Sequence, residues 1–225
     1  DLTKLILVLL ACYSFLDGTA QKYIDTKAIQ TDGYDIPIRI KLPKKTTGKN
    51  PVYFFVHGGG WNGGDAKNVP PARLHNDVNY LADQLGVIYV GLAYRCKGNY
   101  ATFSDAIEDL EASVQWFFDN ADTYNADITR IGFGGASAGS TLAAIMAQKY
   151  TNCKLLVGAE GMYNLVEHSE ERSLFPNQKA RIAYGLATEN ESKKASAYYN
   201  LSENPPNTLL LHGDADVLCH YTQSI

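Results

Sequence analysis

The sequence has no block of lysine and arginine, and its formal net charge is −4. Proteins that bind nucleic acid usually carry a clustered basic surface, so this charge balance argues against DNA or RNA as a partner. The four cysteines lack the spacing of a zinc site, and neither a P-loop nor a glycine-rich dinucleotide motif is present. We therefore expect no metal, no cofactor and no nucleic-acid partner.

The sequence also lacks an apolar run of the length that spans a membrane, which is roughly 20 residues. Its most apolar stretch, Leu5–Leu16, follows Lys4, and the small residues of Gly18–Ala20 suit a signal-peptidase site. This pattern predicts a signal peptide over residues 1–20 and a secreted or periplasmic protein. The apolar run up to Cys12 also resembles a bacterial lipobox, so a lipid anchor at Cys12 is an alternative, as is an N-terminal core element.

The remaining chain has the composition of one globular domain, expected over residues 21–225. With 45% hydrophobic and 20% charged residues, it can bury a substantial core. Strand-type runs alternate with helical patterns, which predicts an α/β fold with a mostly parallel sheet and helices on both faces. The expected strands are 34–42, 52–56, 87–92, 155–159 and 208–211, and the expected helices are 70–85, 103–117 and 140–148.

A G-x-S-x-G pentapeptide, Gly135–Gly139, lies between a strand-like run and an alanine-rich helical run. Its glycines permit a sharp strand-to-helix turn that exposes Ser137 at the N-terminus of the helix, where the helix dipole favours negative charge. Taken alone, the pentapeptide is equally compatible with a glycine- and serine-rich loop. The pattern makes Ser137 a candidate nucleophile.

A second glycine motif, His57–Gly60, follows the strand expected over 52–56. Three consecutive glycines leave backbone N–H groups open to a substrate oxygen, as the oxyanion of an acyl-transfer intermediate requires. In esterases and lipases this loop acts together with the N–H of the residue after the nucleophile, which is Ala138 here. The two motifs together predict a serine hydrolase.

Near the end of the sequence, the apolar run 208–211 is followed by His212 and by two acids, Asp214 and Asp216. The acid of a catalytic triad in such a fold lies just past a strand end, after the serine and before the histidine in the chain. Spacing alone leaves the choice between the two acids open.

At this point the chain resembles the α/β-hydrolase-fold esterases of the HGGG type, including hormone-sensitive-lipase-like carboxylesterases and small acetylxylan and feruloyl esterases. The resemblance extends from about residue 35 to residue 225. The matching segments are His57–Asp65, Ala93–Arg95, Asp109 with Trp116, Asp127–Ile131, Gly135–Gly139 and His212–Asp216.

The resemblance implies a serine hydrolase of carboxylic esters, acting on short-chain acyl or polysaccharide-linked substrates. It implies Asp216 as the triad acid, because the family pattern is H-G-x-x-D, with Asp214 and the more remote Glu160 as alternatives. Trp61 and His57 are expected in the substrate pocket. The remaining implied roles are Ser137 as nucleophile and Gly59, Gly60 and Ala138 as oxyanion donors.

The sequence departs from the family at the catalytic base. The family histidine follows the acid after one more strand, whereas His220 is too close to Asp216 for that geometry and His168 lies before the acid. We expect the base beyond Ile225, with the last strand and helix of the fold missing from this sequence. The alternatives are a non-catalytic binding protein and an amide hydrolase of the same fold.

Two assignments stay open at the level of sequence. Tyr184, Tyr198 and Tyr199 lie in a polar stretch where such insertions form lids or pocket walls, so they either stack on a sugar or phenolic ring or pack within the protein. Cys96 and Cys219 both follow strands, so they either pair as a disulfide or stay buried thiols.

Overall fold

The computed structural model describes residues 23–46, 48–67, 75–96, 98, 100–166 and 184–225. The predicted signal peptide with Cys12, and also His168, lie outside the described residues.

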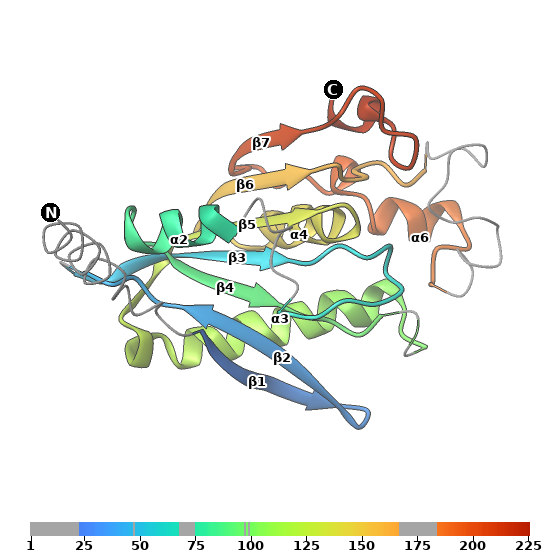
Figure 1. The fold of residues 1–225 in the computed structure, drawn as a ribbon. Helices are drawn as coiled ribbons and strands as arrows, with labels where there is room; N and C mark the ends of the chain where they lie inside the picture. The colour runs from blue at the N-terminus through green and yellow to red at the C-terminus, as the bar shows by residue number, and fades with distance from the viewer. Residues whose placement is uncertain (1–22, 47, 68–74, 97, 99, 167–183) are drawn as a thin grey trace, which may run out of the picture.

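A seven-stranded sheet forms the centre of the molecule (Figure 1), in the order β1-β2-β4-β3-β5-β6-β7. The first two strands form an antiparallel hairpin, and β2 also pairs antiparallel with β4. All other neighbours are parallel. The strands are β1 (Ile24–Thr31), β2 (Tyr34–Lys41), β3 (Asn50–Val56), β4 (Ile88–Leu92), β5 (Ala126–Ala136), β6 (Cys153–Ala159) and β7 (Asn207–Leu211).

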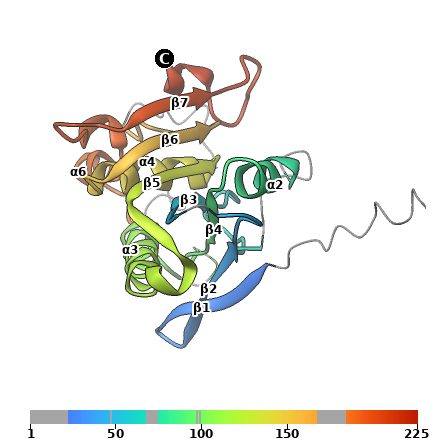
Figure 2. The same ribbon diagram turned by 90° about the vertical axis from the view of Figure 1, so that its left-hand side faces the viewer.

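Helices cover both faces of this sheet, as Figure 2 shows from the end. The helix α2 (His75–Asp83) lies on one face, and α3 (Phe103–Asp119), α4 (Ala138–Lys149) and α6 (Glu189–Lys194) lie on the other. Short 3₁₀ turns complete the described elements at Ala121–Tyr124, Ala197–Tyr199 and Tyr221–Ser224. The predicted α/β class, with a mostly parallel sheet and helices on both faces, is confirmed.

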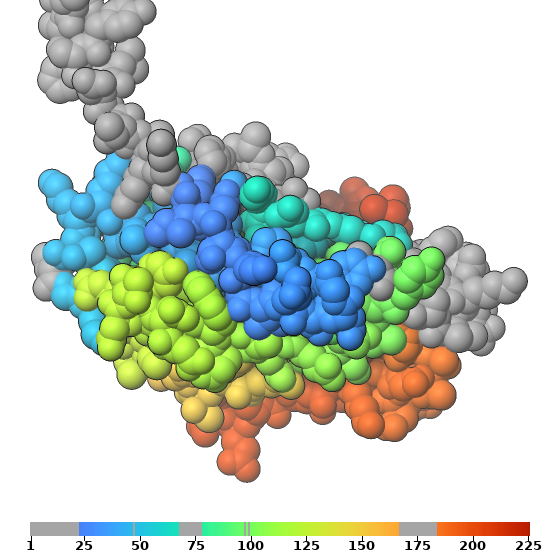
Figure 3. All heavy atoms as spheres, turned by 90° about the horizontal axis from the view of Figure 1, so that it is seen from below, coloured from blue at the N-terminus to red at the C-terminus, as the bar shows by residue number. Residues whose placement is uncertain are grey.

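The amphipathic pattern of α3 explains its position. A capping box between Thr102 and Asp105 fixes its first turn, since each side chain bonds the backbone N–H of the other residue. Its apolar residues recur at helical spacing and pack on the sheet, and Figure 3 shows the helix beside the β1–β2 hairpin. The buried apolar residues of the helix are Phe103, Ala106, Ile107, Leu110, Val114 and Phe117.

β7 is the edge strand of the sheet at the end opposite to β1. Leu210 packs against the core, whereas Leu209 and Leu211 point to the other face, and each is 51% exposed.

Among the described residues, no helix combines the length and the apolar character needed to cross a membrane.

Candidate active site

Ser137 lies in the turn between β5 and α4, at the carboxyl edge of the parallel strands. Its backbone has φ 53° and ψ −127°, a strained conformation for a residue with a side chain. Two hydrogen bonds hold this turn: the Ser137 N–H donates to the Ala159 carbonyl at 2.8 Å, and Ser140 N–H donates to the Ser137 carbonyl at 2.9 Å. The side chain is only half-buried, which suits an accessible nucleophile.

The turn at Ser137 requires glycine on both sides, because the neighbouring backbone leaves no room for a side chain. A Cβ at Gly135 would lie 2.4 Å from the backbone of Gly139, and a Cβ at Gly139 would lie 2.2 Å from the Val56 carbonyl oxygen. Both contacts are with backbone, so neither could be relieved by a rotamer change. The start of α4 is thereby packed directly on the end of β3.

The glycine loop after β3 lies next to Ser137. A Cβ at Gly58 would lie 3.5 Å from the Ser137 Cβ. Gly59 and Gly60 have φ of 119° and 60°, in the region that favours glycine. A hydrogen bond of 3.0 Å from Asn62 N–H to the Gly59 carbonyl closes the turn.

Ala138 completes the set of predicted oxyanion donors. It is the first residue of α4, where backbone N–H groups have no acceptor within the helix. The structure thus brings the glycine loop, Ser137 and the N-terminus of α4 together, although their segments lie far apart in the sequence. The arrangement is suited to hold negative charge beside the Ser137 hydroxyl.

His57 and Trp61, which the sequence analysis expects in the substrate pocket, both have buried side chains. His57 is 2% exposed, and its ring stacks on Tyr94 with centroids 4.4 Å apart. Burial lowers the pKa of His57, although a backbone contact and Asp65 oppose the shift. Trp61 is fully buried and packs against Phe103 and Tyr184. Both side chains support the loop from beneath.

Asp216 is fixed in the turn that follows β7. Its Oδ1 accepts hydrogen bonds from the N–H groups of Leu218 at 2.8 Å and Cys219 at 3.0 Å. Partial burial acts to raise the pKa of Asp216, but these two bonds and the nearby His212 outweigh it, so the net pKa is lowered. Asp214 is exposed. Glu160, the more remote alternative, is also exposed, and its carboxylate accepts no hydrogen bond from the described residues. The geometry therefore favours Asp216 over both Asp214 and Glu160 as an oriented carboxylate.

His212 and His220, the two described histidines near this acid, both have partners other than Ser137. His212 Nε2 lies 2.7 Å from the Cys219 carbonyl oxygen and 3.4 Å from Asp216 Oδ2, and its Nδ1 contacts Ser224 Oγ at 2.8 Å. His220 contacts the Thr222 hydroxyl at 2.9 Å. Within the described part of the chain, Ser137 receives no hydrogen bond from a histidine.

The structure shows where the three tyrosines and the cysteines that the sequence left open lie. Tyr184 is fully buried and packs against Phe103 and Trp61, so it is a core residue. Tyr198 and Tyr199 are 61% and 41% exposed and contact each other edge to face. The cysteines Cys96, Cys153 and Cys219 are all buried, and no disulfide joins any of them in the described part of the chain.

Other contacts around the turn were not apparent from the sequence. The Ser140 hydroxyl contacts the Tyr163 hydroxyl at 2.8 Å, beneath the turn. Gln223 Oε1 accepts from the N–H groups of Tyr163 and Asn164 at 2.9 and 2.8 Å, which ties the end of the chain to the segment after β6. These are long-range contacts without a local sequence signal.

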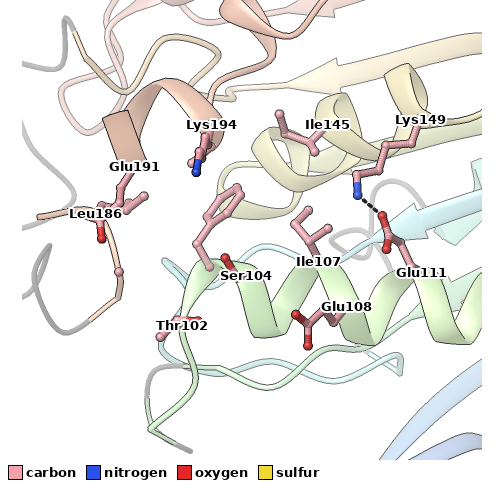
Figure 4. A pocket seen from close by; sticks show the side chains of 13 residues that line it. Thr102, Ser104, Ile107, Glu108, Glu111, Ile145, Lys149, Leu186, Glu191 and Lys194 are labelled. Carbon is pink, nitrogen blue, oxygen red and sulfur yellow. Dashed lines mark hydrogen bonds and ion pairs between the residues drawn. The ribbon is translucent and has the colours of Figure 1, made fainter. Parts of the chain in front are cut away.

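A hollow of about 560 Å³ lies between α3, α4 and α6 (Figure 4). Its apolar lining includes Ile107 and Ile145, and an ion pair between Lys149 and Glu111 crosses one end. Ser137 is not among the residues that line it, so this hollow is separate from the candidate active site.

A known protein family matches most of this sequence. The BD-FAE family model matches residues 38–225, which include all the motifs described above. The chain belongs to the BD-FAE family.

The curated proteins that this BD-FAE chain resembles include proteins named as esterases and as deacetylases. An arylacetamide deacetylase of Bos taurus is 36% identical over 118 residues, 51% of this chain and 29% of the relative. Carboxylesterase NlhH of Mycobacterium tuberculosis is 34% identical over 127 residues, 56% of this chain and 38% of the relative. An acetyl esterase of Salmonella schwarzengrund is 29% identical, over 67% of this chain and 46% of the relative. The matched segments thus span less than half the length of these curated relatives.

Solved structures agree on the fold of the BD-FAE chain. The apo form of Thermogutta terrifontis esterase 2 superposes with a TM-score of 0.73 at 20% identity, covering 90% of this chain and 75% of that one. This similarity establishes the α/β-hydrolase fold.

Proposed function

We propose that this protein is a serine hydrolase of carboxylic esters. The observation that carries the proposal is the position of Ser137: a strained, half-buried serine between the N-terminus of α4 and the glycine loop after β3. This arrangement joins a nucleophile to preorganised N–H donors, which are the two requirements of acyl transfer.

In the proposed mechanism, Ser137 Oγ attacks the ester carbonyl carbon, and the carbonyl oxygen takes up negative charge. The N–H groups of Gly59, Gly60 and Ala138 stabilise this oxyanion, each contributing about 10²–10³ in rate. Collapse of the intermediate expels the alcohol and leaves an acyl-enzyme on Ser137. Water then attacks the acyl carbon and releases the acid.

The reaction also needs a base that takes the Ser137 proton and returns it to the leaving alcohol. We assign this role to a histidine that follows Asp216 in the order of the family. Asp216 would accept a hydrogen bond from that imidazole and stabilise its cationic form. Its lowered pKa keeps the carboxylate ionised at neutral pH, as this role requires.

For the substrate, we propose small-molecule esters of short acyl chains, with polysaccharide-linked esters as a narrower class. The name of the carboxylesterase relative supports an ester substrate, and that of the acetyl esterase supports a short acyl group. The arylacetamide deacetylases among the relatives favour a second candidate, hydrolysis of acetamides at the same serine. Comparing 4-nitrophenyl acetate with 4-nitroacetanilide separates the two, since each releases a chromophore after cleavage of one bond.

The decisive experiment replaces the nucleophile, Ser137→Ala. We expect hydrolysis of 4-nitrophenyl acetate to fall by at least about 10³-fold, with labelling by a fluorophosphonate probe lost as well. Ser104→Ala is the matched control, because this serine is exposed on α3. Equal activity of Ser137→Ala and wild type would refute the proposal. A wild-type protein that neither hydrolyses the ester nor reacts with the probe would indicate a non-catalytic binding protein.

The N-terminal sequence leads us to propose further that the protein leaves the cytoplasm. Residues 1–20 would direct export and be removed, or Cys12 would receive a lipid anchor. Support comes from the sequence pattern of Lys4, the apolar run and Gly18–Ala20.

A further inference from the structure

Ser137 and Glu160 occupy equivalent places on adjacent parallel strands. Ala136 ends β5 and is the register partner of Ala159, which ends β6. Ser137 follows Ala136 directly, and Glu160 follows Ala159. The Ser137 N–H donates to the Ala159 carbonyl at 2.8 Å. Because neighbouring strands lie about 4.8 Å apart, Ser137 and Glu160 leave the sheet side by side.

The two residues also share a positive φ where they leave the sheet. Ser137 has φ 53° and Glu160 has φ 56°, a region that residues other than glycine rarely adopt. The Glu160 N–H donates to the Leu211 carbonyl at 2.8 Å, which fixes its backbone against β7. Its side chain is exposed at the same sheet edge as the nucleophile.

Within the described ranges of the chain, the Glu160 carboxylate takes part in no ion pair, and Arg95, which follows β4, is already held by three other carboxylates. Burial, followed by the negative charges of Asp216 and Glu160, raises the pKa of the Cys219 thiol to about 12. Both carboxylates therefore lie close enough to Cys219 to act on its thiol.

We propose that Glu160 is a specificity-determining residue that favours esters carrying a cationic amine over neutral esters of the same shape. This inference rests on the proposed function, since it assumes that Ser137 is the reacting group. A substrate bound to Ser137 passes beside Glu160, so a positive charge on its leaving group is attracted to the carboxylate. Because the carboxylate is open to water, we expect kcat/KM for the cationic ester to exceed that for the neutral one by about fivefold.

The test compares two thioesters that differ in charge alone: acetylthiocholine and its uncharged isostere, 3,3-dimethylbutyl thioacetate. Thiol release gives kcat/KM for each. We expect Glu160→Gln to lower the ratio of the charged to the neutral substrate by about fivefold, and to change kcat/KM for the neutral one less than about twofold. Glu160→Asp should keep most of the preference. High salt should weaken the preference of the wild type, because the charges are exposed.

The matched control is Glu203→Gln, which removes the same charge from an exposed residue that precedes β7, at the opposite sheet edge. Its substrate ratio should equal that of the wild type. An unchanged ratio in Glu160→Gln, or an equal loss in Glu203→Gln, would overturn the role of Glu160 while leaving the hydrolase intact. If the wild type hydrolysed neither thioester, the proposed function would be overturned, together with the preference for cationic esters.

Discussion

Gly58 lies against the strand that leads to the nucleophile: a Cβ at Gly58 would stand 2.8 Å from the carbonyl oxygen of Ala136. That oxygen belongs to the backbone of the residue before Ser137, so the contact cannot be relieved by a side-chain movement. The distance between the glycine loop and the nucleophile is thus set by the absence of a side chain at Gly58.

We therefore predict that Gly58→Ala displaces the oxyanion loop from Ser137. The expected result is a loss of about 10²-fold or more in kcat for 4-nitrophenyl acetate, because the N–H donors no longer meet the oxyanion. Gly63→Ala is the control in the same loop, since a Cβ at Gly63 meets nothing within 4 Å. Equal activity of the two variants would contradict the close approach.

A second prediction concerns the buried ion pair of Arg95 and Asp109, whose side chains are 8% and 2% exposed. The guanidinium donates to both carboxylate oxygens, at distances between 2.9 and 3.1 Å. Asp109→Ala leaves the guanidinium without its buried partner, so the free energy of unfolding should fall by about 3–5 kcal/mol. Urea denaturation measures this change.

The control for that experiment is an exposed pair, Glu189 and Lys193, whose side chains are 67% and 44% exposed. Lys193→Ala should lower the free energy of unfolding far less than Asp109→Ala does, since water screens the interaction. Similar losses for Asp109→Ala and Lys193→Ala would show that burial does not strengthen the Arg95 contact.

A third prediction follows from Asp127, at the start of β5. Hydrogen bonds from the Thr129 hydroxyl, the Arg130 guanidinium and the Thr129 N–H lower its pKa to about 2, from an ordinary value of 3.8. Since the folded state binds the proton more weakly than the unfolded chain, the carboxylate stabilises the fold fully above pH 3.8. This contribution is lost as the pH falls toward about 2.

Asp127→Asn should therefore be less stable than the wild type at pH about 6, and the difference should shrink as the pH falls through that window. Urea denaturation of both proteins over a pH series gives the comparison. A difference in stability that stays constant down to about pH 2 would mean that ionisation of Asp127 does not contribute.

The fourth prediction concerns the N-terminus. Expression in a bacterium with its secretion apparatus should yield an exported protein that begins at Gln21, as mass spectrometry of the intact protein would show. Replacing Ala20 by a bulky residue, Ala20→Phe, should block this cleavage. Lipidation at Cys12 would instead give a membrane-bound product that Cys12→Ser releases, and an unprocessed cytoplasmic protein would contradict both forms of export.

Much of this protein was predictable from the sequence because its signals are local. The alternation of strand and helix patterns gave the α/β class, and the glycines around Ser137 and after His57 predicted the two turns that meet at the active site. Each signal reflects the backbone conformation that a few consecutive residues can adopt. The expected strands 34–42, 52–56, 87–92 and 208–211 end within two residues of those observed, whereas β1 and α6 were not expected, and the start of the helix expected over 70–85 lies outside the described residues.

The tertiary structure alone decided which side chains face substrate and which face the core. The sequence predicted a pocket position for Trp61 and left that of Tyr184 open, whereas contacts between distant segments bury both side chains in the core. The position of Glu160 beside Ser137 depends on the register of β5 with β6, two strands separated by a helix. Sequence specifies local conformation, whereas burial and register depend on long-range packing, which has no signature in a short stretch of residues.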